Sequence, residues 1–100
     1  MARILYFVTD MDQMSTRLAL EHKDDEVGIC LMQDAVYFGC KGKNANGMLA
    51  EAIKRGIQVF TAKKDVELRG LTELIQPEIK VLSYSGIIDL VFKYDRIINF

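Results

Sequence analysis

The sequence has few cysteines, histidines and prolines, the residues that build many metal sites, disulfide frameworks and rigid linkers. It has no tryptophan, one proline, one histidine (His22) and two cysteines, Cys30 and Cys40. Two cysteines at this spacing match no zinc or disulfide framework, and one histidine cannot complete a metal site with them. We therefore expect no metal, no proline-rich linker and a chain kept reduced in the cytoplasm.

An excess of one charge and a long apolar run are also missing. The 13 basic and 14 acidic residues leave a formal net charge of −1, so no global field attracts nucleic acid or an anionic membrane. The N-terminal apolar run, residues 4–8, is too short for a signal peptide or a membrane span. We expect no membrane partner and no direct contact with nucleic acid.

Nucleotide-binding and hydrolase signatures are absent. The segment GCKGKNANG, residues 39–47, has neither the G-x-G-x-x-G spacing of dinucleotide-binding loops nor the G-K-S/T ending of a P-loop. The single histidine lies in a charged connector, HKDDE, far from any predicted strand end, so it completes no Ser-His-Asp set. We expect no cofactor.

Apolar residues, by contrast, are abundant. They make up 50% of the 100 residues, and the mean hydropathy is +0.08. A chain of this length leaves about a third of its unfolded surface exposed even when compact. We therefore expect a single domain over residues 1–100 that buries apolar surface against other subunits, as a homo- or hetero-oligomer.

The predicted sheet is organised around residues 27–42, VGICLMQDAVYFGCKG. Residues 27–32 are apolar on both faces, which is typical of a strand inside a parallel sheet covered by helices. Further strands are predicted at residues 3–9, 57–62, 79–83 and 96–100. Helices are predicted between them, at residues 10–22, 46–55, 65–69 and 85–94. This alternation favours a mostly parallel sheet of four to five strands.

The last predicted helix is apolar over much of its circumference, and Ser85 is its predicted cap. One stripe at helical spacing is predicted to face the sheet: Ile87, Val91 and Tyr94. Ile88 and Phe92 are expected to widen this buried stripe. Apolar residues also end the chain, so we expect the last helix or the last strand to contribute to an interface.

Polar side chains follow the predicted middle strand where it ends. Ligands collect outside the carboxyl ends of parallel strands, so four residues are candidate binding residues: Gln33, Asp34, Tyr37 and Lys41. Asp34 either orients a substrate or accepts backbone N–H bonds in the turn that follows.

The two cysteines have different surroundings. Cys30 lies inside the apolar strand, where a thiol behaves as a small hydrophobe with a raised pKa. Cys40 stands between glycines and has lysines on its C-terminal side that favour the thiolate. Two interpretations stay open for Cys40: packing against Tyr37 or Phe38, and a reactive thiol.

Three segments taken together resemble the DsrH/TusB family of small sulfur-relay subunits: LMQDAVYFG, VFTAKKDVELRGL and IKVLSYSGIIDLVFKYDRIINF. They follow in order between residue 27 and residue 100. The resemblance implies a compact α/β/α sandwich, in agreement with the strand and helix pattern. We therefore expect a single three-layer α/β/α sandwich with a mostly parallel sheet of four to five strands.

The resemblance also implies partners and a function. Members of this family are associated with DsrE-like and DsrF-like subunits in cytoplasmic complexes that pass persulfide sulfur between proteins. In one branch the sulfur goes toward 2-thiouridine at the wobble position of tRNA, and in another the complexes serve sulfur oxidation. Such transfer needs a thiolate that a partner's cysteine can reach.

The chain departs from the cysteine pattern of that family. It has no cysteine between residues 11 and 22, where some DsrH-like proteins carry one, and it has Thr61-Ala62-Lys63 where DsrE-like subunits carry their sulfur-bearing cysteine. This favours a non-catalytic structural or regulatory subunit. Two alternatives stay open: Cys40 as a displaced persulfide carrier, and a homo-oligomeric module that binds a small molecule or nucleotide through Gln33, Asp34 and Lys41.

Overall fold

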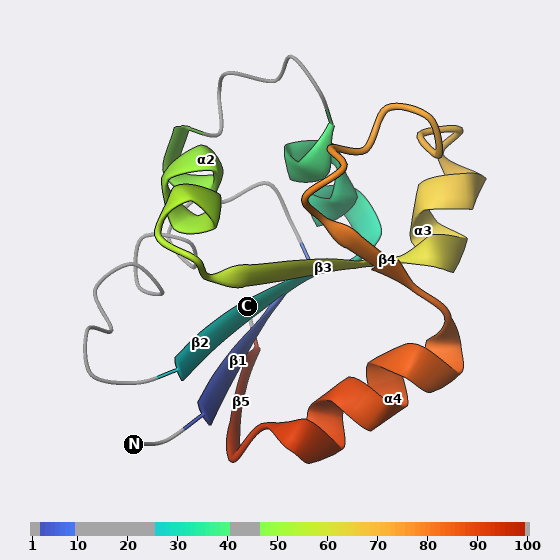
Figure 1. Ribbon diagram of the computed structural model, residues 1–100. Coiled ribbons are helices and arrows are strands. Elements are labelled where there is room, and N and C mark those ends of the chain that lie inside the picture. Colours follow the sequence, from blue (N-terminus) through green and yellow to red (C-terminus); the bar gives the residue numbers. More distant parts are fainter. Residues whose placement is uncertain (1–2, 10–25, 41–46, 100) are drawn as a thin grey trace.

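The computed structural model describes residues 3–9, 26–40 and 47–99, and its five strands form one parallel sheet (Figure 1). The strands are β1 (Arg3–Val8), β2 (Glu26–Leu31), β3 (Gln58–Ala62), β4 (Lys80–Leu82) and β5 (Arg96–Asn99). Their order is β4-β3-β2-β1-β5, and every neighbouring pair is parallel. The predicted parallel sheet is confirmed, with the apolar strand β2 at its centre.

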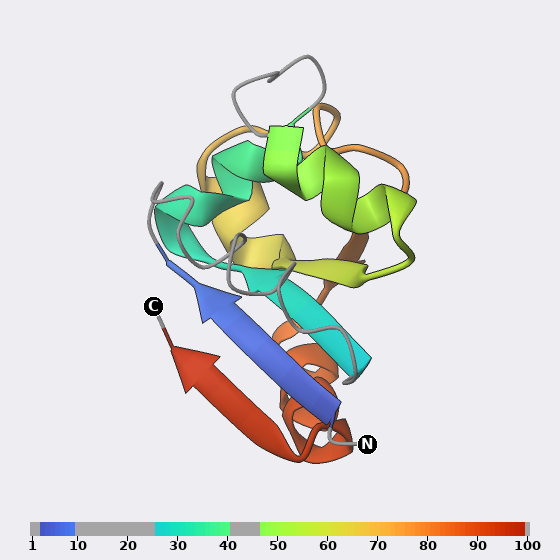
Figure 2. The same ribbon diagram turned by 90° about the vertical axis from the view of Figure 1, so that its left-hand side faces the viewer.

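Helices cover both faces of this sheet. They are the 3₁₀ helix η1 (Gln33–Gly39) and the α-helices α2 (Gly47–Lys54), α3 (Lys63–Leu68) and α4 (Tyr84–Lys93). Figures 1 and 2 show α2 and η1 on one side of the sheet and α4 on the other. The predicted three-layer α/β/α sandwich is therefore confirmed.

Each face of the sheet has its own core. The larger core joins alternate residues of β1, β2 and β3, such as Tyr6, Ile29 and Val59, to side chains of η1, α2 and α3. The smaller core joins Leu5, Cys30 and other residues of the opposite face to α4. Because successive side chains of a strand point to opposite faces, a central strand covered on both sides must be apolar throughout.

The start of α4 differs from the prediction. The helix begins at Tyr84, and the hydroxyl oxygen of Ser83, not of Ser85, accepts a hydrogen bond from the backbone N–H of Gly86 (3.4 Å). The Ser85 hydroxyl instead lies 3.2 Å from the Ser83 hydroxyl. Ser83 has the extended backbone of a cap residue, which leaves its side chain free to reach the first turn.

The buried face of α4 also differs from the prediction. Ile87, Leu90 and Tyr94 are buried against the sheet, whereas Ile88 and Phe92 are exposed. The expectation that Ile88 and Phe92 widen the buried stripe is wrong, because a helix lying on one face of a sheet buries only about a third of its circumference.

Two glycines end helices as their positions predict. Gly56 follows α2 with a φ of 86°, and Gly70 follows α3 with a φ of 65°. Such left-handed backbone is strained for residues with a Cβ, so glycine is preferred there. The predicted helix at residues 10–22 and the candidate residue Lys41 lie outside the described residues. In the described part of the chain, no helix is both long and apolar enough to cross a membrane.

Candidate functional site at the carboxyl edge of the sheet

The ends of β2 and β3 are tied together at one edge of the sheet. All strands are parallel, so their carboxyl ends lie on the same side. The hydroxyl of Thr61, near the end of β3, donates a buried hydrogen bond of 3.0 Å to the carbonyl oxygen of Leu31, the last residue of β2. This bond fixes the two strand ends, and the turns that follow them, in one position.

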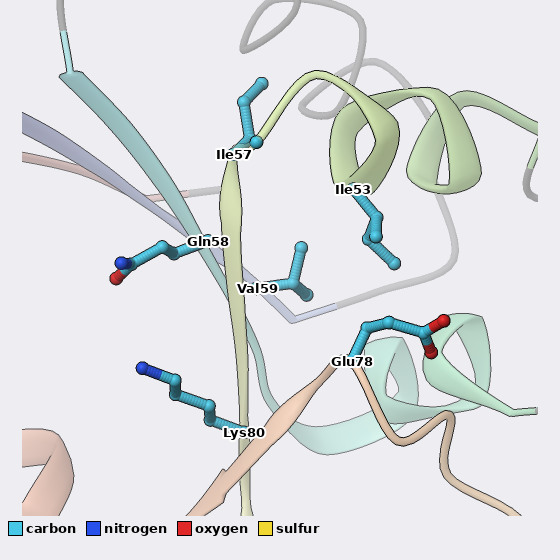
Figure 3. Close-up of a pocket in the computed structure, with 7 residues that line it drawn as sticks. Ile53, Ile57, Gln58, Val59, Glu78 and Lys80 are labelled. Atoms are coloured by element: carbon cyan, nitrogen blue, oxygen red, sulfur yellow. The ribbon is translucent and has the colours of Figure 1, made fainter.

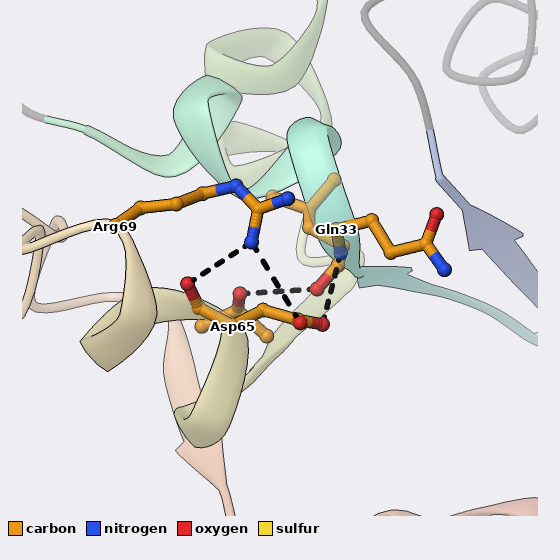
Figure 4. A network of polar contacts seen from close by, with 5 residues as sticks. Gln33, Asp65 and Arg69 are labelled. Atoms are coloured by element: carbon orange, nitrogen blue, oxygen red, sulfur yellow. Dashed lines mark hydrogen bonds and ion pairs between the residues drawn. The ribbon is translucent and has the colours of Figure 1, made fainter.

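Gln33 has strained backbone at this edge. Its φ is 53°, and it is the one non-glycine residue among those described with a positive φ. Its backbone N–H donates a hydrogen bond of 2.9 Å to Oδ2 of Asp65 in α3 (Figure 4). The side-chain amide of Gln33 points away from Asp65 and is exposed. Left-handed backbone at such a position persists only when the surroundings hold it, and it is most common at functional sites.

Arg69 completes this polar cluster one turn further along the chain. Its Nη1 lies 3.7 Å from Oδ1 of Asp65 and donates a hydrogen bond of 3.4 Å to the Asp65 carbonyl oxygen. Asp65 and Arg69 are four residues apart, the spacing at which helical side chains pair, so sequence spacing alone accounts for this contact. The long-range bond from Asp65 to Gln33 is the part that the spacing alone could not predict.

A cavity of about 270 Å³ opens beside this cluster, between the ends of β2, β3 and β4 and the start of α4. Its apolar wall is formed by four residues: Met32, Ala62, Leu82 and Ile87. Its polar rim is formed by four others: Gln33, Lys63, Lys64 and Asp65. Tyr84 also lines it and is largely exposed. With Asp65 paired to Arg69, the two lysines give this rim a positive charge.

The candidate residues chosen from the sequence do not all lie at this cavity. Gln33 lines it, whereas Tyr37 is half-buried against the larger core. Asp34 lies in the first turn of η1. The residues that sequence reasoning missed at this edge are Lys63 and Lys64. Both lysines come directly after β3, the strand next to β2, and this position could have identified them as residues of the same edge.

Cys40 lies in the core rather than in an open loop. Only 3% of its surface is exposed, and it forms an isolated antiparallel bridge with Ile75. It packs in the larger core together with Val36 and, at the edge of that core, Tyr37. Of the two interpretations of this thiol, the structure favours packing.

Cys30 is fully buried in the middle of β2, as its apolar surroundings predict. Burial raises the pKa of its thiol to about 12, and the nearby carboxylate of Asp65 contributes in the same direction. At neutral pH the thiolate fraction is therefore about a thousandfold lower than for an ordinary cysteine. Cys30 is a core residue and not a nucleophile.

Alkylation tests this assignment. We expect iodoacetamide at pH 7.5 to leave Cys30 unmodified in the native protein and to modify it once urea unfolds the chain, as read by peptide mass spectrometry. Because the native thiol holds its proton more tightly than the unfolded one, stability should also fall from about pH 9 toward pH 12. Cys30→Ala should reduce that fall. Equal labelling of native and unfolded protein would contradict the assignment.

A second cavity, of about 240 Å³, lies at the opposite edge of the sheet, near the start of β3 (Figure 3). Ile53 of α2 and Val59 point to one side of it, while Gln58 and Lys80 project to the other face of the sheet. It is far from the strained turn at Gln33 and lies at the amino ends of the strands. The carboxyl edge is therefore the better candidate site.

Comparison with known proteins identifies the family. The profile of the DsrH family, described as "DsrH like protein", matches residues 9–97. This chain belongs to the DsrH family. Protein TusB from Photorhabdus laumondii subsp. laumondii is 30% identical over 68 residues, which are 68% of this chain and 68% of that protein. As a DsrH-family member, the chain is a sulfur-relay subunit.

Solved structures share the fold of this DsrH-family chain. The crystal structure of the ychN protein from E. coli superposes with a TM-score of 0.85 at 20% identity, over 100% of both chains. The protein MTH1491 from Methanobacterium thermoautotrophicum gives a TM-score of 0.77 at 12% identity, also over 100% of both chains. At this level of identity the likeness establishes the α/β sandwich and nothing about activity.

Proposed function

We propose that this chain is a structural or regulatory subunit of a cytoplasmic sulfur-relay assembly and does not itself carry the sulfur. Its partners are DsrE-like and DsrF-like subunits, and the relay leads toward 2-thiouridine at the wobble position of tRNA. One observation carries the proposal: the described residues that line the carboxyl-edge cavity include no cysteine, because β3 ends at Ala62 and Lys63 follows it. DsrE-like subunits carry their sulfur-bearing cysteine at that place.

Burial of both cysteines supports the same role. A persulfide carrier must expose its sulfur to the cysteine of the donor and then to that of the acceptor, since each transfer is a direct attack on sulfur. Cys30 has no exposed surface and Cys40 has 3%. For Cys40 to act as a displaced carrier, the η1 end and its bridge to Ile75 would have to open at every transfer.

The alternative of a small-molecule or nucleotide-binding module has weaker support. Ligand sites usually occupy 300–1,000 Å³, and the carboxyl-edge cavity is about 270 Å³. Of the three residues that such a module would use, Gln33 lines the cavity, Asp34 lies in η1, and Lys41 lies outside the described residues. No nucleotide-binding loop was found in the sequence either.

Co-expression followed by sulfur loading tests the proposal. The chain should co-purify under mild salt with the DsrE-like and DsrF-like subunits of its own organism. After incubation of the complex with a cysteine desulfurase and cysteine, intact-mass spectrometry should show a sulfur adduct on the DsrE-like subunit and none on this chain. Complexes that contain the Cys40→Ser or Cys30→Ser chain should assemble, and their DsrE-like subunit should take up sulfur as it does in the complex with the unmodified chain.

Two results would contradict the proposal in different ways. A sulfur adduct on this chain that disappears only in Cys40→Ser would make Cys40 a carrier at an unexpected place. Absence of any complex with either partner, with folded protein on both sides, would show that the chain is not a subunit of such an assembly.

A further inference from the structure

Two lysines at the carboxyl-edge cavity carry charge that the described fold does not neutralise. Lys63 and Lys64 are exposed and line the cavity, and among the described residues neither forms an ion pair. The acidic residue on the same rim, Asp65, is engaged by Arg69 at 3.7 Å and by the backbone N–H of Gln33 at 2.9 Å (Figure 4). The rim therefore presents positive charge to whatever enters the cavity.

The wall behind these lysines is apolar and firmly held. Ala62 and Ile87 are buried, and Met32 and Leu82 pack against the smaller core. The hydroxyl of Thr61 ties together the ends of β2 and β3 that carry this wall, through its buried hydrogen bond of 3.0 Å. A cavity held in this way exists before a ligand arrives, so little ordering opposes binding.

The size of the cavity suits one large side chain. Its volume is about 270 Å³, and a closed cavity of about 150 Å³ holds a benzene ring. One aromatic or aliphatic side chain therefore fits, with room for a carboxylate at the rim and the exposed ring of Tyr84 beside it. A nucleotide calls for the larger volume of ordinary small-molecule sites, about 300–1,000 Å³. An inorganic anion would make no use of the apolar wall.

We infer that the carboxyl-edge cavity is the docking site for an acidic peptide of a partner protein. The peptide inserts one apolar side chain against the wall and sets an adjacent Asp or Glu carboxylate against Lys63 and Lys64. A nucleic acid backbone would need an extended basic stripe, whereas two lysines on one rim match one or two carboxylates. The inference rests on the proposed function only in that a relay subunit has partner proteins, and it involves no sulfur transfer.

Peptides of defined composition test the inference. The acidic set is acetyl-Gly-Ser-X-Z-Ser-Gly-amide, together with the same peptides in the order Z-X, where X is Leu, Ile, Met or Phe and Z is Asp or Glu. The control set has Asn or Gln at Z. We expect at least one acidic peptide at about 1 mM to shift the methyl resonances of Met32, Ala62 and Ile87. Its amide counterpart should bind at least about fivefold more weakly, since only the carboxylate is attracted by the lysines.

Charge reversal locates the contact. Lys63→Glu with Lys64→Glu should weaken binding of the acidic peptide at least about tenfold, because two attractions become repulsions. Acidic residues are favoured in the first turn of a helix, so this change at the start of α3 should preserve the fold, as circular dichroism checks. The matched control is Lys54→Glu with Lys93→Glu, which changes the net charge equally at exposed positions of α2 and α4. It should alter binding by less than about twofold.

Four results would each overturn the inference. They are no methyl shift with any acidic peptide, equal binding of the amide set, binding that the change at residues 63 and 64 leaves intact, and tighter binding of free 3-phenylpropionate than of every peptide. The last would assign the cavity to a small organic acid. Co-purification and sulfur loading with the partner subunits do not use these peptides, so the inference and the proposed function can fail separately.

Discussion

Gly28→Val is expected to destabilise the protein by about 3 kcal/mol, at the upper end of the range for overpacked cores. Gly28 lies in β2 directly under the ring of Tyr94. A Cβ built on Gly28 would collide with the Tyr94 hydroxyl. It would also lie 2.9 Å from Cζ of Tyr94 and 3.2 Å from Cδ1 of Leu5. The ring has little freedom to retreat, because it is buried and the guanidinium of Arg3 stacks over it at 5.3 Å. Urea unfolding at constant m measures the loss.

Tyr94→Phe provides the matched control for this contact. The hydroxyl is the atom nearest to the added Cβ, so Gly28→Ala should cost about 1 kcal/mol less in the Tyr94→Phe background than alone. Burial is the main cause that raises the pKa of Tyr94; Glu26 adds to the increase and Arg3 opposes it. The phenol is therefore neutral at pH 7, and its removal deletes no charge. Equal costs of Gly28→Ala in both backgrounds would show that the strain lies elsewhere, for instance at Leu5.

The architecture could be predicted from the sequence because its main signal is local. Residues 27–32 are apolar on both faces, and only a central parallel strand buries both faces. Glycines at 56 and 70 mark the helix ends, and both have the left-handed backbone that their positions predict. The order of elements then restricts the topology, since a short strand–helix–strand unit permits only a parallel crossover.

The orientation of α4 could not be predicted in the same way. Its apolar residues cover more than half of the helix circumference, so periodicity alone does not say which row meets the sheet. The turn from β4 decides it, by capping the helix with Ser83 and turning Ile87 and Leu90 inward. Ile88 and Phe92 are therefore exposed apolar residues whose explanation lies outside the fold of one chain.

The candidate site was predicted by position but not in its contacts. Gln33 follows the central strand, so the strand-end rule finds it. The hydrogen bond from Gln33 to Asp65 joins residues 32 positions apart in the sequence, and Cys40 forms a bridge with Ile75 at a similar separation in the sequence. Contacts of this range depend on how α3 and η1 pack, which no local pattern records. This is why an apparently open loop cysteine turned out to be a core residue.

Asp65→Ala is expected to cost about 2–3 kcal/mol, because one carboxylate serves two partners at the carboxyl edge. Its Oδ2 accepts the Gln33 backbone N–H at 2.9 Å, and its Oδ1 faces Arg69 at 3.7 Å. A hydrogen bond to a charged group contributes about 1.5–3 kcal/mol, whereas a partly exposed ion pair adds less than about 1 kcal/mol. Asp65→Asn keeps an oxygen acceptor for Gln33 and should cost about 1 kcal/mol. Urea unfolding measures both losses.

Gln33→Gly separates the two contributions of Asp65. Glycine adopts a φ of 53° without the strain that a Cβ causes. If the Asp65 carboxylate stabilises the protein by holding this turn, its contribution to the free energy of unfolding should be smaller when residue 33 is glycine. Asp65→Ala should therefore cost about 1 kcal/mol less in the Gln33→Gly background, and amide exchange at residue 33 should accelerate in Asp65→Ala alone. If the two substitutions are additive, Asp65 stabilises the protein through Arg69 and the packing of α3. The left-handed turn would then be held by the Thr61 bond between the ends of β2 and β3.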